Sequence, residues 1–461
     1  MLKDIISANQ NKGINDKEIA ILKKYFPSCF NKEGNFNIQK LENLIQDKVD
    51  ITREGYELRF LGQSYSKLLA SLETETIVMP NLEHNQKEEN KTSENLYVVG
   101  DNLDGLKHLL KSYSEQVKCI YVDPPYNTGK DDFIYADNFN FSSEELEKKL
   151  GIDVEHAQRI IDMTSKGSAS HSAWLTFMYS RLFLAKDLLT DDGVMFISID
   201  GNELANLKLL CDDIFGEVNC LGTIVWKNAT DNNPTNIAIE HEYILCYCAN
   251  RDSIKSEWKS PISNIKTILL KIEEEYIAEY GHDKELLKKK YTEWYRNNKS
   301  FLGKMDGYKF IDNEGIYAGS RSVHNPGKEG YFYDIIHPVT KKPCKKPLMG
   351  YRFPESSMKR LIEEDRIIYG TDENKIVELK VYARDYTDKL ASVIDLDGRS
   401  GANMIRQLFD NQKVFTNPKP VELLKHLFSF VVNKGDIVLD LFGGSSTTAQ
   451  AVLELNSEDT E

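Results

Sequence analysis

The sequence of 461 residues lacks the features of a membrane protein, of a secreted protein and of a protein with a structural metal site. Its apolar residues never form a run of about 18, the length that a membrane-spanning helix needs. The first residues, MLKDIISANQNKG, lack the apolar stretch of a secretory signal. The seven cysteines show no metal-ligand spacing, and Cys246 and Cys248 are too close for a C-x-x-C motif. These absences predict a cytoplasmic protein with reduced thiols, no membrane partner and no bound metal.

The chain also lacks an overall positive charge, because its formal net charge is −14. This excludes a uniformly basic nucleic-acid binder but leaves room for a local basic surface. Residues 251–350 contain 19 lysines and arginines against 14 aspartates and glutamates, a balance of +5, so the rest of the chain carries −19. The stretches KELLKKKYTEWYRNNK (Lys284 to Lys299) and KKPCKK (Lys341 to Lys346) belong to this basic segment. Solvated helix faces explain such a pattern equally well.

Periodicity and composition divide the chain into segments. We expect a small helical N-terminal region at 1–80 and a polar linker at 81–95. Strands alternate with helices at 96–250 and again at 405–461, which predicts one α/β sheet, parallel in its centre. The sequence between them, 251–404, is mixed, basic and dotted with aromatics. Within the sheet we expect LYVV (Leu96 to Val99) to be a strand and Asp191 to Gly193 to be a turn.

Two turns follow strands of this predicted sheet, at the edge where open α/β sheets bind ligands. The turn after the strand IVL runs from Asp440 to Thr447, and its glycines, Gly443 and Gly444, allow a close approach to a ligand. No Gly-Lys-Ser/Thr follows, so the turn is not a phosphate-binding P-loop. A carboxylate at this place suits an amine or a ribose hydroxyl, as in an adenosyl cofactor. A purely structural glycine turn is the alternative.

The other turn is Asp123-Pro124-Pro125-Tyr126. The two proline rings fix the backbone and remove two N–H donors, which leaves a rigid arc of carbonyl acceptors beside a carboxylate. Such an arc suits an exocyclic amino group, with one N–H directed to Asp123 and one to the carbonyl of Pro124. Tyr126 offers a stacking face for a base flipped out of a duplex. A proline-rich loop with a surface aspartate is the alternative.

Together these turns resemble the amino-methylating DNA methyltransferases of the permuted beta group, and most closely the Mod (methylation and specificity) subunits of type III restriction-modification systems. The resemblance rests on Gly100 to Leu103 (Gly-Asp-Asn-Leu), on Asp123 to Gly129 (Asp-Pro-Pro-Tyr-Asn-Thr-Gly), and on further segments in the same order: LTFMYSRLFLAKDLLTDDGVMFISIDGNELANLKLLCDDIFGE, IEHEYILCY and NPKPVELLKHL. It covers about 95–250 and 405–455.

The resemblance implies a doubly wound Rossmann-like sheet in permuted order, with a target-recognition domain inserted at 251–404. The catalytic residues would be Asp123, Pro124, Pro125 and Tyr126. The cofactor, S-adenosyl-L-methionine, would be held by Asp101 near its adenosine, by Lys419 at its polar end, and by Asp440, Phe442 and Gly444. The implied activity is methylation of adenine N6 in double-stranded DNA. The implied partners are a restriction (helicase/endonuclease) subunit and a second copy of the chain.

This chain departs from the family pattern at two places. Ser446 stands where the family has a second glycine, and its Cβ would crowd the cofactor or oppose a left-handed backbone. The family also continues beyond the position of Glu461 into a strand with a ribose-binding acid. We therefore expect an incomplete cofactor half, with an open slot between Leu96–Val99 and Ile437–Leu439.

Other readings stay open at this stage. The chain could be a DNA-recognition or scaffold subunit with weak or no catalysis, or a methyltransferase for RNA or cytosine. We expect His171 to be a hydrogen-bonded loop residue, and Glu240, His241 and Glu242 to alternate faces of a strand rather than share a metal. Aromatics of the inserted segment pack its own core or stack on bases: Trp258, Tyr291, Trp294, Tyr295 and Tyr308.

Overall fold

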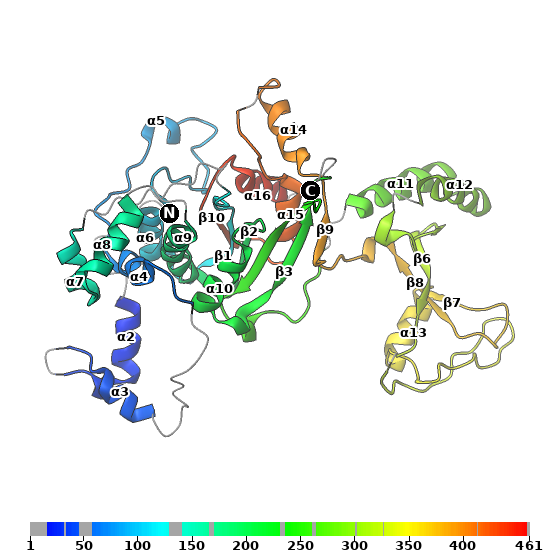
Figure 1. Cartoon of the computed structure of the whole chain (residues 1–461). Coiled ribbons are helices and arrows are strands. Elements are labelled where there is room, and N and C mark those ends of the chain that lie inside the picture. Colours follow the sequence, from blue (N-terminus) through cyan, green and yellow to red (C-terminus); the bar gives the residue numbers. More distant parts are fainter. Residues whose placement is uncertain are drawn as a thin grey trace. The chain divides into compact units, whose positions relative to one another are not determined.

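The chain is divided into two compact units in a computed structural model, Met1–Glu257 with Ala391–Glu461, and Trp258–Leu390 (Figure 1). We refer to them as unit 1 and unit 2. The structure describes residues 16–31, 34–45, 58–128, 141–165, 170–230, 236–260, 264–299, 302–325, 327–412 and 414–458. Short 3₁₀ turns connect longer elements at Pro27–Cys29, Glu217–Asn219, Arg251–Ser253, Gly303–Met305 and Ala383–Asp385.

Unit 1 is built on a six-stranded mixed sheet in the order β10-β1-β2-β4-β3-β9. The first three of these strands are parallel, β4 is antiparallel to β2, β3 is antiparallel to β4, and β9 is parallel to β3. The sheet therefore confirms the predicted α/β class, but the predicted parallel centre is wrong, because the central pair, β2 with β4, is antiparallel and the parallel strands β10, β1 and β2 lie at one end. Its strands are β1 (Val117–Val122), β2 (Leu189–Ile199), β3 (Cys220–Lys227), β4 (His241–Cys248), β9 (Val393–Asp395) and β10 (Ile437–Asp440).

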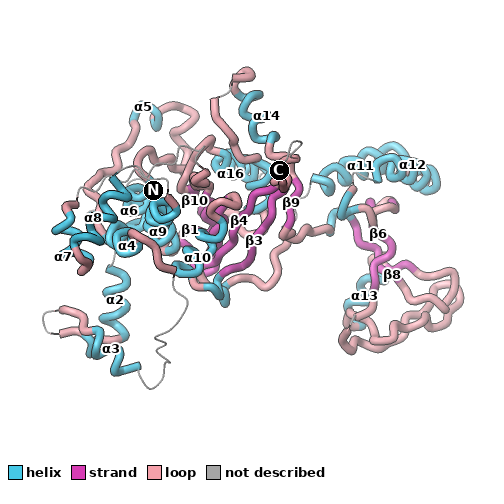
Figure 2. Tube along the Cα trace, viewed as in Figure 1, coloured by secondary structure: helices cyan, strands magenta, loops and turns pink. Residues whose placement is uncertain are grey.

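Both faces of β1 are buried, which is why its sequence VKCIYV is almost continuously apolar. Ile120 and Val122 share a core with Trp174 and Met178 of one helical layer. Tyr121 points the other way, against the ring of Phe428, at a centroid distance of 6.4 Å. The helices around the sheet, coloured cyan in Figure 2, are α6 (Asn102–Tyr113), α9 (His171–Lys186), α10 (Leu204–Phe215), α14 (Arg399–Leu408), α15 (Val421–Phe428) and α16 (Thr447–Glu458).

Further helices precede or interrupt this layer. The described part of the predicted helical N-terminal region contains helices, whereas residues 1–15 and 46–57 of that region lie outside the described residues. The segment predicted as a linker contains one short helix and is mostly exposed. These helices are α2 (Asp16–Tyr25), α3 (Ile38–Ile45), α4 (Gln63–Ser71), α5 (Leu82–Asn85), α7 (Ser143–Leu150) and α8 (Val154–Ser165).

Further predictions about the sheet are wrong. Leu96–Val99 is not a strand, and its side chains are largely exposed, with Val99 at 87%. No slot between two strands forms as expected, because Leu96–Val99 lies outside the sheet; β10 is the edge strand and pairs with β1. Asp191–Gly193 does not precede a strand as a turn but lies within β2, where the pairing with β1 jumps from Leu189 to Val194. An apolar run alone did not distinguish a buried strand from an exposed loop.

Unit 2 combines a helical pair with a second sheet. The sheet is antiparallel, in the order β5-β6-β8-β7. Tyr291 and Tyr308 are buried in its core, and the Tyr291 hydroxyl donates to the Tyr308 carbonyl at 2.6 Å. Trp294 and Tyr295 are partly buried against the same core. The elements are α11 (Asn264–Tyr280), α12 (Lys284–Asn298), β5 (Phe310–Asp312), β6 (Gly315–Ser322), α13 (Glu355–Glu363), β7 (Ile367–Ile368) and β8 (Glu378–Tyr382).

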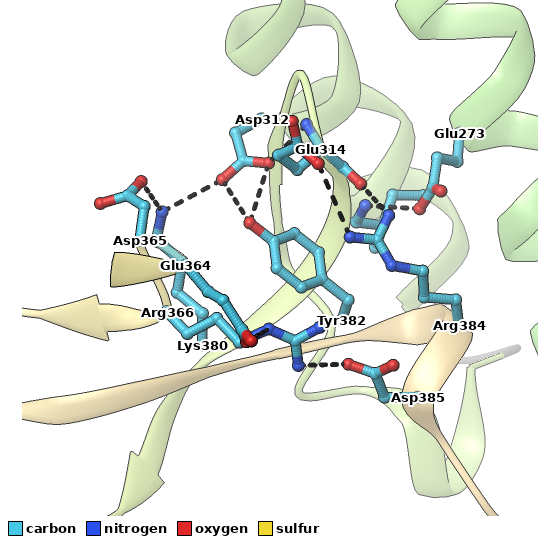
Figure 3. A network of polar contacts seen from close by, with 11 residues as sticks. Glu273, Asp312, Glu314, Glu364, Asp365, Arg366, Lys380, Tyr382, Arg384 and Asp385 are labelled. Atoms are coloured by element: carbon cyan, nitrogen blue, oxygen red, sulfur yellow. Dashed lines mark hydrogen bonds and ion pairs between the residues drawn. The ribbon is translucent and has the colours of Figure 1, made fainter. Parts of the chain in front are cut away.

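A polar network crosses the strands of unit 2 (Figure 3). The Lys380 ammonium lies between Asp312 at 3.2 Å and Asp365 at 2.8 Å, and the Tyr382 hydroxyl donates to Asp312. The Lys380 side chain is only 12% exposed, so its two carboxylate partners keep a nearly buried charge compensated. Arg366 makes a separate ion pair with Asp385 at 2.6 Å. These contacts tie β5 and β8 together, which indicates that unit 2 has an ordered interior of its own.

The cysteines are free thiols inside the fold. Cys119, Cys211 and Cys246 are buried in unit 1, and burial raises the pKa of each thiol. Cys344 is the cysteine of unit 2, and it too is buried with a raised pKa. Among the described residues no helix is long and apolar enough to cross a bilayer.

Candidate active site

The turn from Asp123 to Tyr126 follows the carboxyl end of β1, as predicted, and two side chains hold its backbone, Trp174 from α9 and Asn202 from the turn before α10. The Trp174 indole donates to the carbonyl of Pro125 at 2.7 Å. Asn202 donates to the carbonyl of Tyr126 at 3.2 Å. Within the described part of the chain, the carbonyl of Pro124 has no hydrogen-bond partner, although Pro124 is buried. The turn therefore presents one free carbonyl acceptor beside Asp123.

Lys419 brings the two predicted sites together. Its Nζ atom lies 2.9 Å from Asp123 Oδ1, 2.9 Å from the Tyr126 hydroxyl and 3.3 Å from Glu242 Oε2. The ammonium also lies 4.9 Å from the centroid of the Tyr126 ring and 5.8 Å from that of Trp226. The resemblance implied a role for Lys419 at the polar end of a cofactor; in the structure its ammonium contacts the turn from Asp123 to Tyr126. We call Asp123, Tyr126, Glu242 and Lys419 the charge cluster.

Burial and charge set the protonation of this cluster. Burial lowers the pKa of Lys419, but the carboxylates of Asp123 and Glu242 outweigh it, so that its pKa lies above the ordinary value. Burial, followed by Asp123 and Glu242, raises the pKa of Tyr126 well above its ordinary value. The lysine is therefore a cation and the tyrosine a neutral phenol. That phenol accepts from Lys419 and lies 3.0 Å from both Asp123 Oδ1 and Glu242 Oε2, either of which its single proton can bond.

Glu242 and its neighbours were not predicted as site residues. Alternation along β4 was correctly expected to separate His241 from Glu242, and His241 hydrogen-bonds with Tyr243, whereas Glu240 precedes the strand. What the sequence did not show is that β4 lies next to β2 and delivers Glu242 to the turn after β1. Asn228, just past β3, donates to Glu242 Oε1 at 2.7 Å. The segment IEHEYILCY carried this signal only as part of a family pattern.

A second group of polar side chains, centred on Glu203, holds the residue that follows the turn. Glu203 is fully buried and accepts from Asn127 at 2.7 Å and from Asn206 at 2.7 Å. Its carboxylate also lies 2.6 Å from Nδ1 of His171, which begins α9 rather than lying in a loop as we expected. Asn127 has a left-handed backbone, with φ at 57°, a conformation that asparagine tolerates better than most residues. Glu203 thus fixes Asn127, the residue that follows the turn from Asp123 to Tyr126.

The turn after β10 is folded around Asp440. Its carboxylate accepts from the backbone N–H of Phe442 at 2.8 Å and from the Thr448 hydroxyl at 2.6 Å. Burial raises the pKa of Asp440. Gly444 and Ser446 both have a left-handed backbone, with φ at 50° and 61°. Ser446 therefore adopts the conformation that its Cβ was expected to oppose, at a cost that glycine would avoid.

Asp101 caps the N-terminus of α6 and lies near the turn after β10. Its carboxylate accepts from the backbone N–H groups of Leu103 and Asp104, and it lies 3.4 Å from the buried guanidinium of Arg181. The adjacent Asn102 donates to the carbonyl of Leu441 at 3.3 Å. The residues that the resemblance assigned to a cofactor are thus grouped by contacts at one end of the sheet, Lys419 among them, because its carbonyl accepts from the Thr447 hydroxyl at 3.2 Å.

Comparisons with known proteins match most of the chain to one family. The family model described as DNA methylase matches residues 117–458. The EcoP15I Mod subunit of Escherichia coli, a type III restriction-modification enzyme, is 54% identical over 447 residues, which cover 96% of this chain and 69% of that protein. The EcoPI Mod subunit of Escherichia phage P1 is 37% identical over 466 residues, with 97% of this chain and 68% of that protein covered.

Solved structures are more distant. The PvuII DNA methyltransferase, described as cytosine-N4-specific, has 11% sequence identity and a TM-score of 0.32, and the match covers 77% of each chain. The complex of M1.HpyAVI with SAM has 12% identity and a TM-score of 0.28, with 78% of this chain and 88% of that chain covered.

Proposed function

Because the chain belongs to the Mod subunits of type III restriction-modification enzymes, and is a DNA methyltransferase of that family, we propose that it methylates the N6 amino group of adenine in double-stranded DNA. The methyl donor would be S-adenosyl-L-methionine. The chain would act with a restriction subunit and pair with a second copy of itself. The observation that carries this proposal is the pair of vacant acceptors at the catalytic turn.

These acceptors are Asp123 Oδ2 and the carbonyl oxygen of Pro124. Within the described residues, Asp123 uses Oδ1 for both Lys419 and Tyr126, and its Oδ2 has no partner. An exocyclic amino group has two N–H donors and would satisfy both acceptors. As these bonds turn the nitrogen out of conjugation with the ring, its lone pair becomes available to an electrophilic methyl group. Asp123 then orients the amine and receives the proton that the methylated nitrogen releases.

Tyr126 would supply the stacking face for the flipped adenine. Its hydroxyl is fixed by Lys419 and by the carboxylates of Asp123 and Glu242, so the ring is held in one orientation. A preoriented ring loses little freedom when a base stacks on it. Stacking of this kind contributes about 1–3 kcal/mol per base.

The cofactor would lie over the turn after β10, whose aromatic neighbours fit a planar adenine ring. A Cβ at Gly443 would be 3.6 Å from the ring of Tyr97, and one at Gly444 would be 3.5 Å from the ring of Phe415, so aromatic side chains flank the bare backbone. Phe442 and Asp101 are at the same end of the sheet and would contact the adenosine. When bound, the cofactor supplies a methyl group on a sulfonium. Asp440 shapes the turn from inside, and Lys419 holds Asp123.

Unit 2 would read the DNA sequence as the target-recognition domain. Its loop from Lys341 to Lys346 exposes four lysines. Lys342 and Lys346 form ion pairs with Glu373 and Asp334, whereas Lys341 and Lys345 have no side-chain partner among the described residues. Unpaired, exposed lysines are suited to DNA phosphates.

Methyl transfer to DNA tests this proposal directly. The chain would be incubated with radiolabelled S-adenosyl-L-methionine and duplex DNA of random sequence, and the digested nucleosides would be separated. We expect label in N6-methyladenine. The variant Asp123→Ala should transfer none while it still binds DNA, because the basic segment is unchanged. Label in N4-methylcytosine, or an Asp123→Ala variant within a few-fold of the parent, would refute the assignment.

A further inference from the structure

Glu242 is a second carboxylate at the reaction centre, although the acceptor geometry of the catalytic turn does not require one. Its Oε2 atom lies 3.0 Å from the Tyr126 hydroxyl and 3.3 Å from Lys419 Nζ. Its Oε1 atom accepts from Asn228 at 2.7 Å. Both oxygens are occupied and the side chain is 23% exposed. Glu242 therefore has a fixed orientation, and it acts through its neighbours.

The formal charges of the cluster sum to −1. Asp123 and Glu242 contribute two negative charges, Lys419 contributes one positive charge, and the neutral phenol of Tyr126 contributes none. The Lys419 ammonium lies closer to Asp123, at 2.9 Å, than to Glu242, at 3.3 Å. Without Glu242, the lysine would cancel the charge of Asp123 and the centre would be neutral.

Methyl transfer is favoured by a negative charge at the reaction centre. The lone pair of the amino nitrogen forms the new N–C bond while the C–S bond breaks and its electron pair goes to sulfur. The positive charge thus moves from sulfur to nitrogen, and the nitrogen then gives a proton to a carboxylate. Fixed negative charge near the place where positive charge develops stabilises the transition state more than the ground state. In a site shielded from water this interaction is stronger than in bulk solvent.

Resting on the methyl transfer proposed above, we propose that Glu242 restores to the reaction centre the negative charge that Lys419 neutralises on Asp123, and so stabilises the cationic amino nitrogen. Glu242 is a positioning and electrostatic residue that does not touch the base. Lys419 in turn keeps the two carboxylates together and holds the Tyr126 hydroxyl. The centre thereby combines a rigid arrangement with a single net negative charge.

Charge-balanced variants test this role. Glu242→Gln keeps the size and the acceptor for Asn228 but brings the cluster to a net charge of zero, whereas Glu242→Asp keeps the charge. The double variant Glu242→Gln/Lys419→Met returns the cluster to −1. We expect Glu242→Gln to slow single-turnover methylation about 30-fold, and the double variant to recover about tenfold of that loss. Glu242→Asp should remain within about threefold of the parent.

Binding measurements separate charge from folding. Calorimetry with S-adenosylhomocysteine and salt-matched DNA titrations should give the same affinities for the parent and Glu242→Gln, so that the single-turnover rate changes and KM does not. The cluster of Lys425 with Glu454 and Glu458 is the matched control, because it too places a lysine between two carboxylates of unit 1. Glu454→Gln should leave the rate unchanged.

Two results would overturn the role of Glu242: a parental rate in Glu242→Gln, or a double variant slower than Glu242→Gln alone. The second result would mean that Glu242 and Lys419 act only as structural supports. A parent chain that methylates no DNA would instead refute the proposed function and this inference with it. A parent that methylates while Glu242→Gln is unaffected would refute the inference alone.

Discussion

At the scale of single residues, the hydroxyl of Tyr126 has more partners than a stacking ring requires. It bonds with Lys419 and lies within hydrogen-bond distance of Asp123 and Glu242. In the proposed reaction the phenol therefore offers both a face for the base and a link between charged groups. These two contributions can be separated by mutation, because phenylalanine keeps the face and alanine removes both.

We expect Tyr126→Phe to reduce single-turnover methylation about tenfold and Tyr126→Ala to reduce it by about 100-fold or more, since stacking adds about 1–3 kcal/mol. A duplex with 2-aminopurine at the methylated position reports base flipping by its fluorescence. The signal should rise with the parent and Tyr126→Phe but not with Tyr126→Ala. Equal losses of rate in both variants, with flipping retained, would assign the whole effect to the hydroxyl.

The raised pKa of Asp440 predicts how the stability of the protein changes with pH. Burial raises its pKa in the folded state, so its contribution to stability is present at acidic pH, below its unfolded pKa of about 3.9, and is lost as the pH rises through the folded value. Asp440→Asn removes the free-energy cost of burying a charged carboxylate and keeps an acceptor for the backbone N–H of Phe442. Its melting temperature should equal that of the parent near pH 4 and exceed it at pH 7. The exposed Asp395→Asn is the control, and a melting temperature below the parent at pH 7 would contradict the prediction for Asp440→Asn.

At the scale of elements, α14 packs closely on the segment that carries Lys419. A Cβ on Gly401 would lie 2.5 Å from the carbonyl oxygen of Pro418 and 2.8 Å from that of Lys419. Both contacts are shorter than van der Waals distance and involve backbone atoms. Any side chain at this position therefore has to move the segment.

Gly401→Ala should displace Lys419 and lower both the methylation rate and the melting temperature, although alanine is the better helix former by about 1 kcal/mol. Gly105→Ala in α6 is the matched control, because nothing lies within 4 Å of the added Cβ. It should keep the parental rate and melt at the same or a higher temperature. If both variants behave alike, the close approach of α14 does not position Lys419.

Much of the element structure could be predicted from the sequence, because the signals were local. The alternating pattern at 96–250 and 405–461 indicated the segments that form α6, α9, α10 and α15. The strand at Leu96–Val99 could not be excluded, since burial depends on partners that are distant in sequence. The same holds for the site. The turns after β1 and β10 were predictable, whereas the approach of Glu242 and Lys419 depends on the strand order and on the path of one side chain.

At the scale of the whole molecule, a net charge of −14 coexists with a proposed DNA-binding role. The resolution that we propose is a division of labour in which exposed lysines of unit 2 meet the phosphates. Each phosphate contact releases counterions, so affinity for DNA falls with salt. The salt dependence of the affinity therefore measures how many lysines contact phosphates.

The double variant Lys341→Gln/Lys345→Gln should lower the slope of log affinity against log salt by about 2, since each phosphate contact contributes about 0.9. Fluorescence anisotropy of a labelled duplex at several salt concentrations measures the slope. Lys359→Gln on α13 is the control, because Lys359 is paired with Glu355 at 2.9 Å. A slope equal to that of the parent would remove this loop from the DNA interface.

The buried thiols make local unfolding of each unit measurable by chemical modification. A cysteine inside the fold reacts with an alkylating reagent only when the surrounding structure opens. Cys119, Cys211 and Cys246 report on unit 1, and Cys344 reports on unit 2. Pulsed alkylation followed by mass spectrometry would therefore time the opening of each unit separately, without an added label, and would show which unit gains protection when DNA or cofactor is present.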